Sequence, residues 1–177
     1  LLQAWFIRQE MAWVYNYLPF WLKVLRKIES IVRTEMNSLW AQEILMPALW
    51  SKEHWETTKR WDSIDVLFHL PASDNKEYAL NPTHEDLVTP LMSEFVQSYK
   101  DLEFWVYQIQ NKFRNEKRAK SWLLRGREFL MKDLYSFHKS EETLLAYYNE
   151  AKVAYKNVFD KLGLWKDTYE TLASGWD

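Results

Sequence analysis

The sequence predicts one domain of the α+β class. Two long segments, Pro19–Leu39 and Ser140–Leu162, carry apolar residues at steps of three and four, which is the spacing of an amphipathic helix. Within residues 106–133, two segments alternate between polar and apolar residues, as strands do, and a charged loop separates them. The length of 177 residues is that of a single domain.

Composition narrows the classes of function. The formal net charge of −2 argues against a generally basic nucleic-acid coat. Cysteine is absent, which excludes disulfides and cysteine-ligated metals, and the four histidines are scattered. No apolar run approaches the ~18 residues of a membrane span, and no signal peptide is visible. We therefore expect a cytoplasmic protein without a membrane segment and without a metal held by its own side chains.

The first long helix is expected to bury one apolar stripe. The stripe consists of Leu22, Leu25, Ile28, Val32, Met36 and Leu39, while charged residues, Glu35 among them, occupy the other face. Gln42–Met46 then reads as a short strand that ends at Pro47, because proline cannot donate to a strand ladder.

The middle of the chain predicts a hairpin followed by a helix. Trp55 and Trp61 are expected to anchor a polar segment. Val66–Leu70 and Glu77–Leu80 are predicted strands, and residues 73–76 supply turn residues between them.

The helix that follows leaves two questions open. Pro90 lies within its pattern, so either the helix begins there with Thr89 as its cap, or one helix is kinked. Thr83 and Glu85 fit simple capping, with threonine at the start and an acid in the first turn.

The segment 106–133 holds the candidate site. Gln108, Gln110, Lys112 and Arg114 share one face of the first strand. Near the turn, cationic side chains gather at Arg118, Lys120, Arg125 and Arg127. Guanidinium groups suit phosphate because their planar fork donates two hydrogen bonds to one anion, although solvated surface charge looks similar in a sequence.

The last helix has clear end signals. Ser140 is the expected N-cap, and Gly163 fits the left-handed residue that ends a helix. Its predicted buried stripe comprises Leu144, Tyr148, Ala151, Tyr155, Phe159 and Leu162.

Six stretches resemble bacterial-type prolyl-tRNA synthetases, which are class II aminoacyl-tRNA synthetases. They are FIRQ (6–9), NYLP (16–19), AQEILMP (41–47), PTHED (82–86), YQIQNKFRNE (107–116) and LLRGREFLMKDLYSFH (123–138). The resemblance covers nearly all of residues 1–177 and implies a partial catalytic core, an antiparallel sheet flanked by helices. Motif 1 of the class would span about 19–47, with Pro47 at a homodimer interface, and motif 2 would span about 106–133. Motif 3, an editing domain and an anticodon-binding domain would lie outside this sequence.

The resemblance also implies a reaction and its residues. L-proline would attack ATP to form prolyl-adenylate, with Mg²⁺ on the phosphates, and the prolyl group would pass to tRNA(Pro). Arg114 would hold the α-phosphate and the proline carboxylate, and Glu116 would contact the nucleotide. Arg125 would reach the outer phosphates, and Phe129 would stack on adenine. Thr83 and Glu85 would receive the proline amino group.

Two other functions remain open at this point. One is a synthetase-like paralogue that activates an amino acid without charging tRNA. The other is a non-catalytic module that uses only the dimerisation helix and strand. The 177-residue chain alone is not expected to adenylate proline.

Tryptophan and glycine depart from ordinary usage together. The chain has 11 tryptophans and 3 glycines, whereas glycine averages about 7%. Five tryptophans fall where the resembled family carries glycine, which suggests UGA codons read as glycine. These five are Trp5, Trp13, Trp21, Trp40 and Trp122. The alternative is a real enrichment in aromatic residues, with bulky side chains tolerated at turn positions.

Overall fold

The structure is a computed structural model that describes residues 2, 4–72, 76–117 and 122–171. Its central feature is the predicted strand–loop–strand, which is confirmed as β7 (Phe104–Phe113) and β8 (Glu128–Phe137). The two strands pair antiparallel over their whole length, from Phe104 opposite Phe137 to Phe113 opposite Glu128. Both strands are longer than predicted, because their backbone pairing continues to Phe104 and Phe137.

A third strand makes this sheet mixed rather than wholly antiparallel. β3 (Gln42–Glu43) runs parallel to β7 and is shorter than the predicted strand 42–46. Beyond Glu43 the ladder gives way to other bonds: Ile44 N donates to Tyr107 O at 2.8 Å, and Met46 N donates to Gln110 Oε1 at 3.2 Å. The chain thus stays beside β7 up to Pro47.

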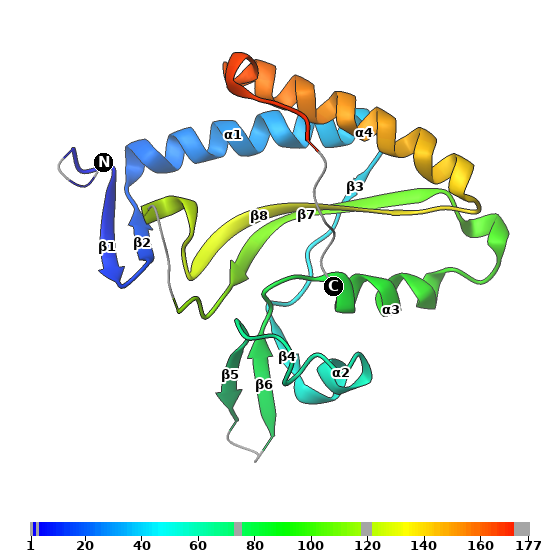
Figure 1. Cartoon of the computed structure of the whole chain (residues 1–177), viewed down its shortest axis with the longest axis horizontal. Coiled ribbons are helices and arrows are strands. Elements are labelled where there is room, and N and C mark those ends of the chain that lie inside the picture. The colour runs from blue at the N-terminus through cyan, green and yellow to red at the C-terminus, as the bar shows by residue number, and fades with distance from the viewer. Residues whose placement is uncertain (1, 3, 73–75, 118–121, 172–177) are drawn as a thin grey trace.

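Two long helices cover one face of β7 and β8 (Figure 1). They are α1 (Pro19–Ser38) and α4 (Glu141–Lys161), close to the predicted bounds. The core beneath them contains Met36, Leu39 and Ala41 from the α1 side, and Tyr107, Tyr147, Ala151 and Ala154 from the other elements. Glu35 was placed on the solvent face of α1, and that is wrong. It is 4% exposed and accepts hydrogen bonds from Asn157 and Lys161 of α4.

The predicted buried stripe of α4 is also wrong. Its buried residues are Tyr147, Ala151, Ala154 and Val158, whereas Tyr148 is 62% exposed. The helix turns its small alanines inward because α1 packs against this side. Only Ala151 belongs to both sets.

The other side of the molecule carries a smaller sheet and two helices (Figure 1). The sheet has the order β4 (Leu49–Ser51), β6 (Glu77–Leu80), β5 (Phe68–Pro71), all antiparallel. The predicted hairpin is therefore confirmed, although turn residues 73–75 lie outside the described residues and β4 was not predicted.

Helices α2 (Lys52–Thr57) and α3 (Glu85–Phe95) flank the smaller sheet. Trp55 and Trp61 are the predicted anchors, at 1% and 6% exposure. Pro90 lies inside α3, so the interpretation in which a helix begins at Pro90 is wrong.

The remaining elements are short. An N-terminal hairpin pairs β1 (Ile7–Met11) with β2 (Val14–Tyr17). Three 3-10 turns, η1 (Tyr99–Asp101), η2 (Trp122–Leu124) and η3 (Trp165–Asp167), complete the described structure.

Candidate functional site

The candidate site lies on the face of β7 and β8 that points away from α1 and α4. Side chains alternate across a strand, so the residues on this face are one set of alternate positions. In β7 they include Gln108, Gln110 and Lys112, and their partners in β8 are Asp133, Met131 and Phe129. Gln108 and Lys112 are fully buried. Polar residues with no access to water need partners inside the protein.

A buried polar chain supplies those partners. Lys112 Nζ lies 2.6 Å from Asp133 Oδ2 and also donates to His84 Nδ1. His84, at the N-cap of α3, uses its other ring nitrogen, Nε2, to donate to Pro47 O at 3.2 Å. Gln108 Nε2 donates to Asp133 Oδ2 at 3.0 Å. This polar chain joins β8, β7, the start of α3 and the end of the predicted motif 1.

The electrostatics follow from that burial. Desolvation and, second, the neighbouring Lys112 charge together lower the pKa of His84 to about 4. Burial also lowers the pKa of Lys112, while the Asp133 carboxylate acts in the opposite direction. Neutral His84 accepts from the lysine through Nδ1, which fixes its tautomer.

Arg114 is the first residue after β7, which ends at Phe113. Its backbone N donates to Arg127 O at 2.9 Å, which holds the two chain ends together. Its Nε donates to Pro82 O at 3.3 Å, and its guanidinium carbon lies 5.4 Å from the centre of the Phe129 ring. Burial lowers the pKa of Arg114, and carboxylates including Glu116 and Glu85 oppose that effect. The guanidinium is thus oriented and only partly solvated, which suits it to bind an anion.

Thr83 and Glu85 directly follow Pro82, whose carbonyl accepts from Arg114, and the Glu85 carboxylate acts on the charge of Arg114. Thr83 is 8% exposed, and its hydroxyl donates to Glu85 Oε2. The N-cap of α3 is His84, and no side chain caps it, so the capping interpretation of Thr83 is wrong. Glu85 does occupy the first turn, as expected.

Glu116 and Arg125 lie in the segments that flank the undescribed part of the loop. Arg125 Nε is 3.8 Å from Glu116 Oε1, and Arg127 Nη2 donates to Glu116 O at 3.4 Å. The Arg125 side chain is 58% exposed and that of Glu116 17%. Arg118 and Lys120 lie outside the described residues. The predicted cationic cluster is therefore described only in its second half.

The Pro47 carbonyl connects the site to the surface. Besides His84, it accepts from Trp50 Nε1 at 3.2 Å and from Asn81 Nδ2 at 3.1 Å. Pro47 itself is exposed, and Leu45, two residues before it, is 83% accessible, whereas Met46 between them is buried. Pro47 therefore lies between an apolar surface and the buried polar chain.

Sequence reasoning missed three residues of this site: His84, Lys112 and Asp133. The alternation of the strand placed Lys112 on the correct face, and that was the available signal. Its burial could not be read from the sequence, because lysine is almost never fully buried unless it is paired. The partners come from segments 28 and 21 residues away in the chain.

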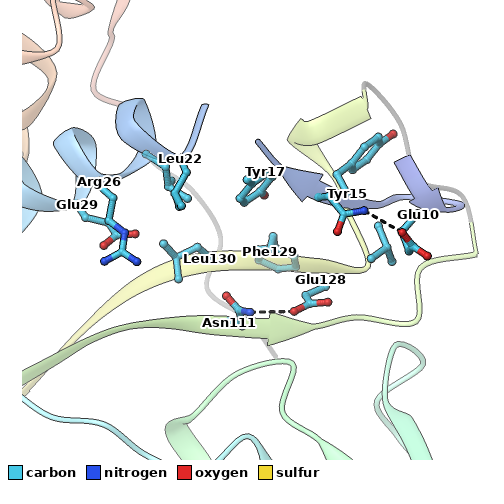
Figure 2. Close-up of a pocket in the computed structure, with 13 residues that line it drawn as sticks. Glu10, Tyr15, Tyr17, Leu22, Arg26, Glu29, Asn111, Glu128, Phe129 and Leu130 are labelled. Carbon is cyan, nitrogen blue, oxygen red and sulfur yellow. Dashed lines mark hydrogen bonds between the residues drawn. The ribbon is translucent and has the colours of Figure 1, made fainter. Parts of the chain in front are cut away.

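A separate hollow lies on the helix side of the ribbon (Figure 2). It measures about 530 Å³ and is lined by the β1–β2 hairpin, the start of α1, and Asn111, Glu128, Phe129 and Leu130. Asn111 Nδ2 donates to Glu128 Oε1 at 2.9 Å there. Of the predicted site residues only Phe129 lines this hollow.

Among the residues that the structure describes, no three His, Asp or Glu side chains group as metal ligands do. Within the same residues, no helix is long and apolar enough to cross a membrane.

Comparison with known proteins agrees with this geometry. The chain is 48% identical over 165 residues to the proline–tRNA ligase of Lysinibacillus sphaericus (strain C3-41), an alignment that covers 93% of this chain and 29% of that relative. It is 50% identical over 165 residues to the proline–tRNA ligase of Bacillus licheniformis, with the same coverage. The chain thus spans less than a third of the length of these relatives.

Solved structures share the fold. The prolyl-tRNA synthetase of Cryptosporidium parvum, complexed with L-proline and AMP, superposes with a TM-score of 0.80 at 18% identity, over 91% of this chain and 32% of that one. The prolyl-tRNA synthetase of Giardia lamblia, in complex with prolyl-adenylate, gives 0.81 at 19% identity, over 89% and 34%. The predicted class II catalytic core is therefore confirmed as the fold. Residues 68–176 match the tRNA synthetase class II core domain (G, H, P, S and T), and the chain belongs to that family.

Proposed function

We propose that this chain is part of a proline–tRNA ligase. The protein would activate L-proline with ATP to prolyl-adenylate and transfer the prolyl group to tRNA(Pro) in the cytoplasm. The observation that carries the proposal is the arrangement around Arg114, whose guanidinium is held by Pro82 O next to the hydrogen-bonded pair Thr83–Glu85. The 48% identity to a proline–tRNA ligase supports the same conclusion. Residues 19–47 would be motif 1 and residues 106–133 motif 2, and motif 3, editing and anticodon-binding domains would belong to the longer protein.

The proposed mechanism assigns each residue a task. The proline carboxylate attacks the α-phosphate of ATP in line, and pyrophosphate leaves. Arg114 binds the α-phosphate, where negative charge builds in the transition state, and contacts the proline carboxylate. Its contact with Pro82 O fixes its direction before substrate arrives, so little reorganisation is needed.

The neighbours complete the site in this proposal. Glu85 accepts a hydrogen bond from the proline amino group, with Thr83 holding the carboxylate in place. Phe129 stacks on adenine, Glu116 contacts the nucleotide, and Arg125 reaches the outer phosphates. The described residues do not form a metal site by themselves. In this proposal Mg²⁺ would be held by the ATP phosphates.

Proline-dependent exchange of pyrophosphate into ATP tests this function in the full-length protein. We expect exchange with proline and a loss of roughly 100-fold or more in the Arg114→Ala variant, since removing one transition-state donor costs about 10²–10³. Lys139→Ala, which changes a surface cation beside Glu103, is the matched control and should leave exchange intact. Exchange with another amino acid but not with proline would refute proline as the substrate. Exchange without tRNA charging would favour the synthetase-like paralogue that activates an amino acid only.

A further inference from the structure

Three tryptophans of this chain have a backbone conformation that belongs to glycine. Trp5, Trp13 and Trp40 have φ values of 57°, 62° and 60°. An L-residue with a bulky side chain rarely adopts this left-handed region, whereas glycine enters it freely. Tryptophan makes up 11 of the 177 residues, yet it supplies three of the five non-glycine residues with positive φ in the described part of the chain.

Trp40 shows the strongest case, because it ends helix α1 in a Schellman motif. Trp40 N donates to Asn37 O at 3.0 Å, and Ala41 N donates to Met36 O at 3.3 Å. These two bonds define the motif, in which the residue after the C-cap is left-handed and usually glycine. Met36 and Ala41 also belong to the same core cluster, and such a hydrophobic contact often accompanies the motif. The Trp40 side chain is 87% exposed, so little packing favours a large residue there.

Helix α4 provides an internal comparison. It ends in the same pair of bonds, from Gly163 N to Asp160 O and from Leu164 N to Phe159 O, both at 2.9 Å. The left-handed residue of that motif is Gly163, with φ of 73°. Position 40 in α1 is thus the structural equivalent of a glycine elsewhere in the chain.

Trp13 and Trp5 occupy turns with the same requirement. Trp13 is the second residue of the two-residue loop between β1 and β2, since Met11 pairs with Val14. A positive φ at the second central position of a tight turn favours glycine. Trp5 closes a turn in which its N donates to Leu2 O at 3.2 Å, and its side chain is 77% exposed.

The Trp13 backbone also makes close contacts. Its carbonyl accepts from Arg127 N at 2.9 Å and would lie 3.2 Å from a Cβ added to Gly126. The loop therefore approaches the start of β8 through backbone atoms. The indole makes a contact that glycine would lose, with the Arg127 guanidinium 5.2 Å from the ring centre.

We infer that positions 5, 13 and 40 are glycine in the protein made by its native host. The tryptophans at these positions of the sequence would correspond to UGA codons, which the host translates as glycine. Trp55 and Trp61 are genuine tryptophans, because both are buried in the core. The geometry does not extend to Trp21, inside α1, or Trp122, in η2, since helical backbone does not call for glycine.

Peptide mass spectrometry of the full-length protein from its host, with sequencing of its gene, tests the inference. We expect glycine residues and UGA codons at positions 5, 13 and 40, and tryptophan with UGG at positions 55 and 61. Tryptophan in the native peptide that contains position 40, or UGG at codon 40, would overturn it.

Thermal unfolding of recombinant full-length protein supplies a second test. Trp40→Gly should raise Tm, and Trp55→Gly should lower it. Lys59→Gly is the matched control, because Lys59 ends α2 in the same motif, with φ of 58° and bonds from Lys59 N to Glu56 O and from Arg60 N to Trp55 O. A Tm that rises with Lys59→Gly but not with Trp40→Gly would contradict the inference.

Discussion

His84 is the residue whose charge state most directly links the site to the fold. It is fully buried, accepts from Lys112 and donates to Pro47 O. A proton on Nδ1 would place two positive charges in contact without water, so the imidazole must remain neutral for the polar chain to persist. The lowered pKa of His84 and its hydrogen bonds both require a neutral imidazole.

The first prediction is that His84 makes stability depend on pH. The pKa of His84 is lowered from 6.5 to about 4 in the folded protein. Below pH 6.5 the unfolded chain therefore binds a proton that the folded chain refuses, so the free energy of unfolding falls as pH falls toward 4. The effect is at most about 3 kcal/mol, and it is absent in His84→Gln.

Urea unfolding of the parent and the variant between pH 4 and pH 7.5 measures the difference. His54→Gln, an exposed histidine of α2, controls for the loss of a surface imidazole. An equal pH slope in parent and His84→Gln would show that His84 is not held neutral.

The residue scale also shows where sequence reasoning ended. Arg114, Glu116, Arg125 and Phe129 could be named from motif resemblance, and the structure brings Arg114 beside Phe129 and Arg125 beside Glu116. Lys112 could be assigned a face but no partner, because Asp133 and His84 become neighbours only after β8 and α3 pack against β7. Tertiary partners of a buried charge are not encoded in local spacing.

At the scale of elements, the pairing of α1 with α4 depends on a buried carboxylate. Glu35 accepts from Asn157 Nδ2 at 3.1 Å and from Lys161. The Lys161 bond lowers the pKa of Glu35 most, and burial opposes it. Its stabilising effect is therefore present above its unfolded pKa of 4.5 and declines as pH falls below that value.

The second prediction concerns this pair of helices. Glu35→Ala should lower the free energy of unfolding by about 1–3 kcal/mol at pH 7, because it removes the hydrogen bonds from Asn157 and Lys161 to a charged acceptor. The midpoint of urea unfolding reports the loss. Glu150→Ala, at an exposed position of α4, should change stability by less than about 0.5 kcal/mol. Equal effects of the two variants would mean that the buried carboxylate contributes no more than a surface one.

The same helices explain which element predictions succeeded. The ends of α4 follow from Ser140, whose side chain accepts from Thr143 N, and from Gly163 with its positive φ. The buried face of α4 could not be read from hydrophobicity, because Tyr148 and Phe159 are apolar enough to suggest the wrong stripe. Packing selected Ala151 and Ala154 instead, since small residues let α1 approach.

At the scale of the whole molecule, one side of β3 pairs with no other described strand, and an apolar surface beside it is exposed. In the described chain β3 pairs only with β7. A groove of about 610 Å³ lies next to it, lined by residues that include Leu45 and Phe95, which are 83% and 69% exposed. Exposed apolar side chains around a groove are typical of a protein interface. The homodimer contact that the family resemblance predicts at Pro47 would occupy this surface.

The third prediction is that Leu45→Asp converts the full-length protein from a dimer to a monomer, because it places a charge in an apolar contact. Sedimentation velocity measures the change, and Val153→Asp, at a 57% exposed position of α4, is the control that should remain dimeric.

The Pro47 carbonyl holds His84 at 3.2 Å, and the polar chain continues through Lys112 to the proposed substrate face. Loss of the dimer should therefore also lower proline-dependent exchange. A monomeric Leu45→Asp protein with full exchange activity would separate the interface from the site, and a parent that is already monomeric would exclude the interface.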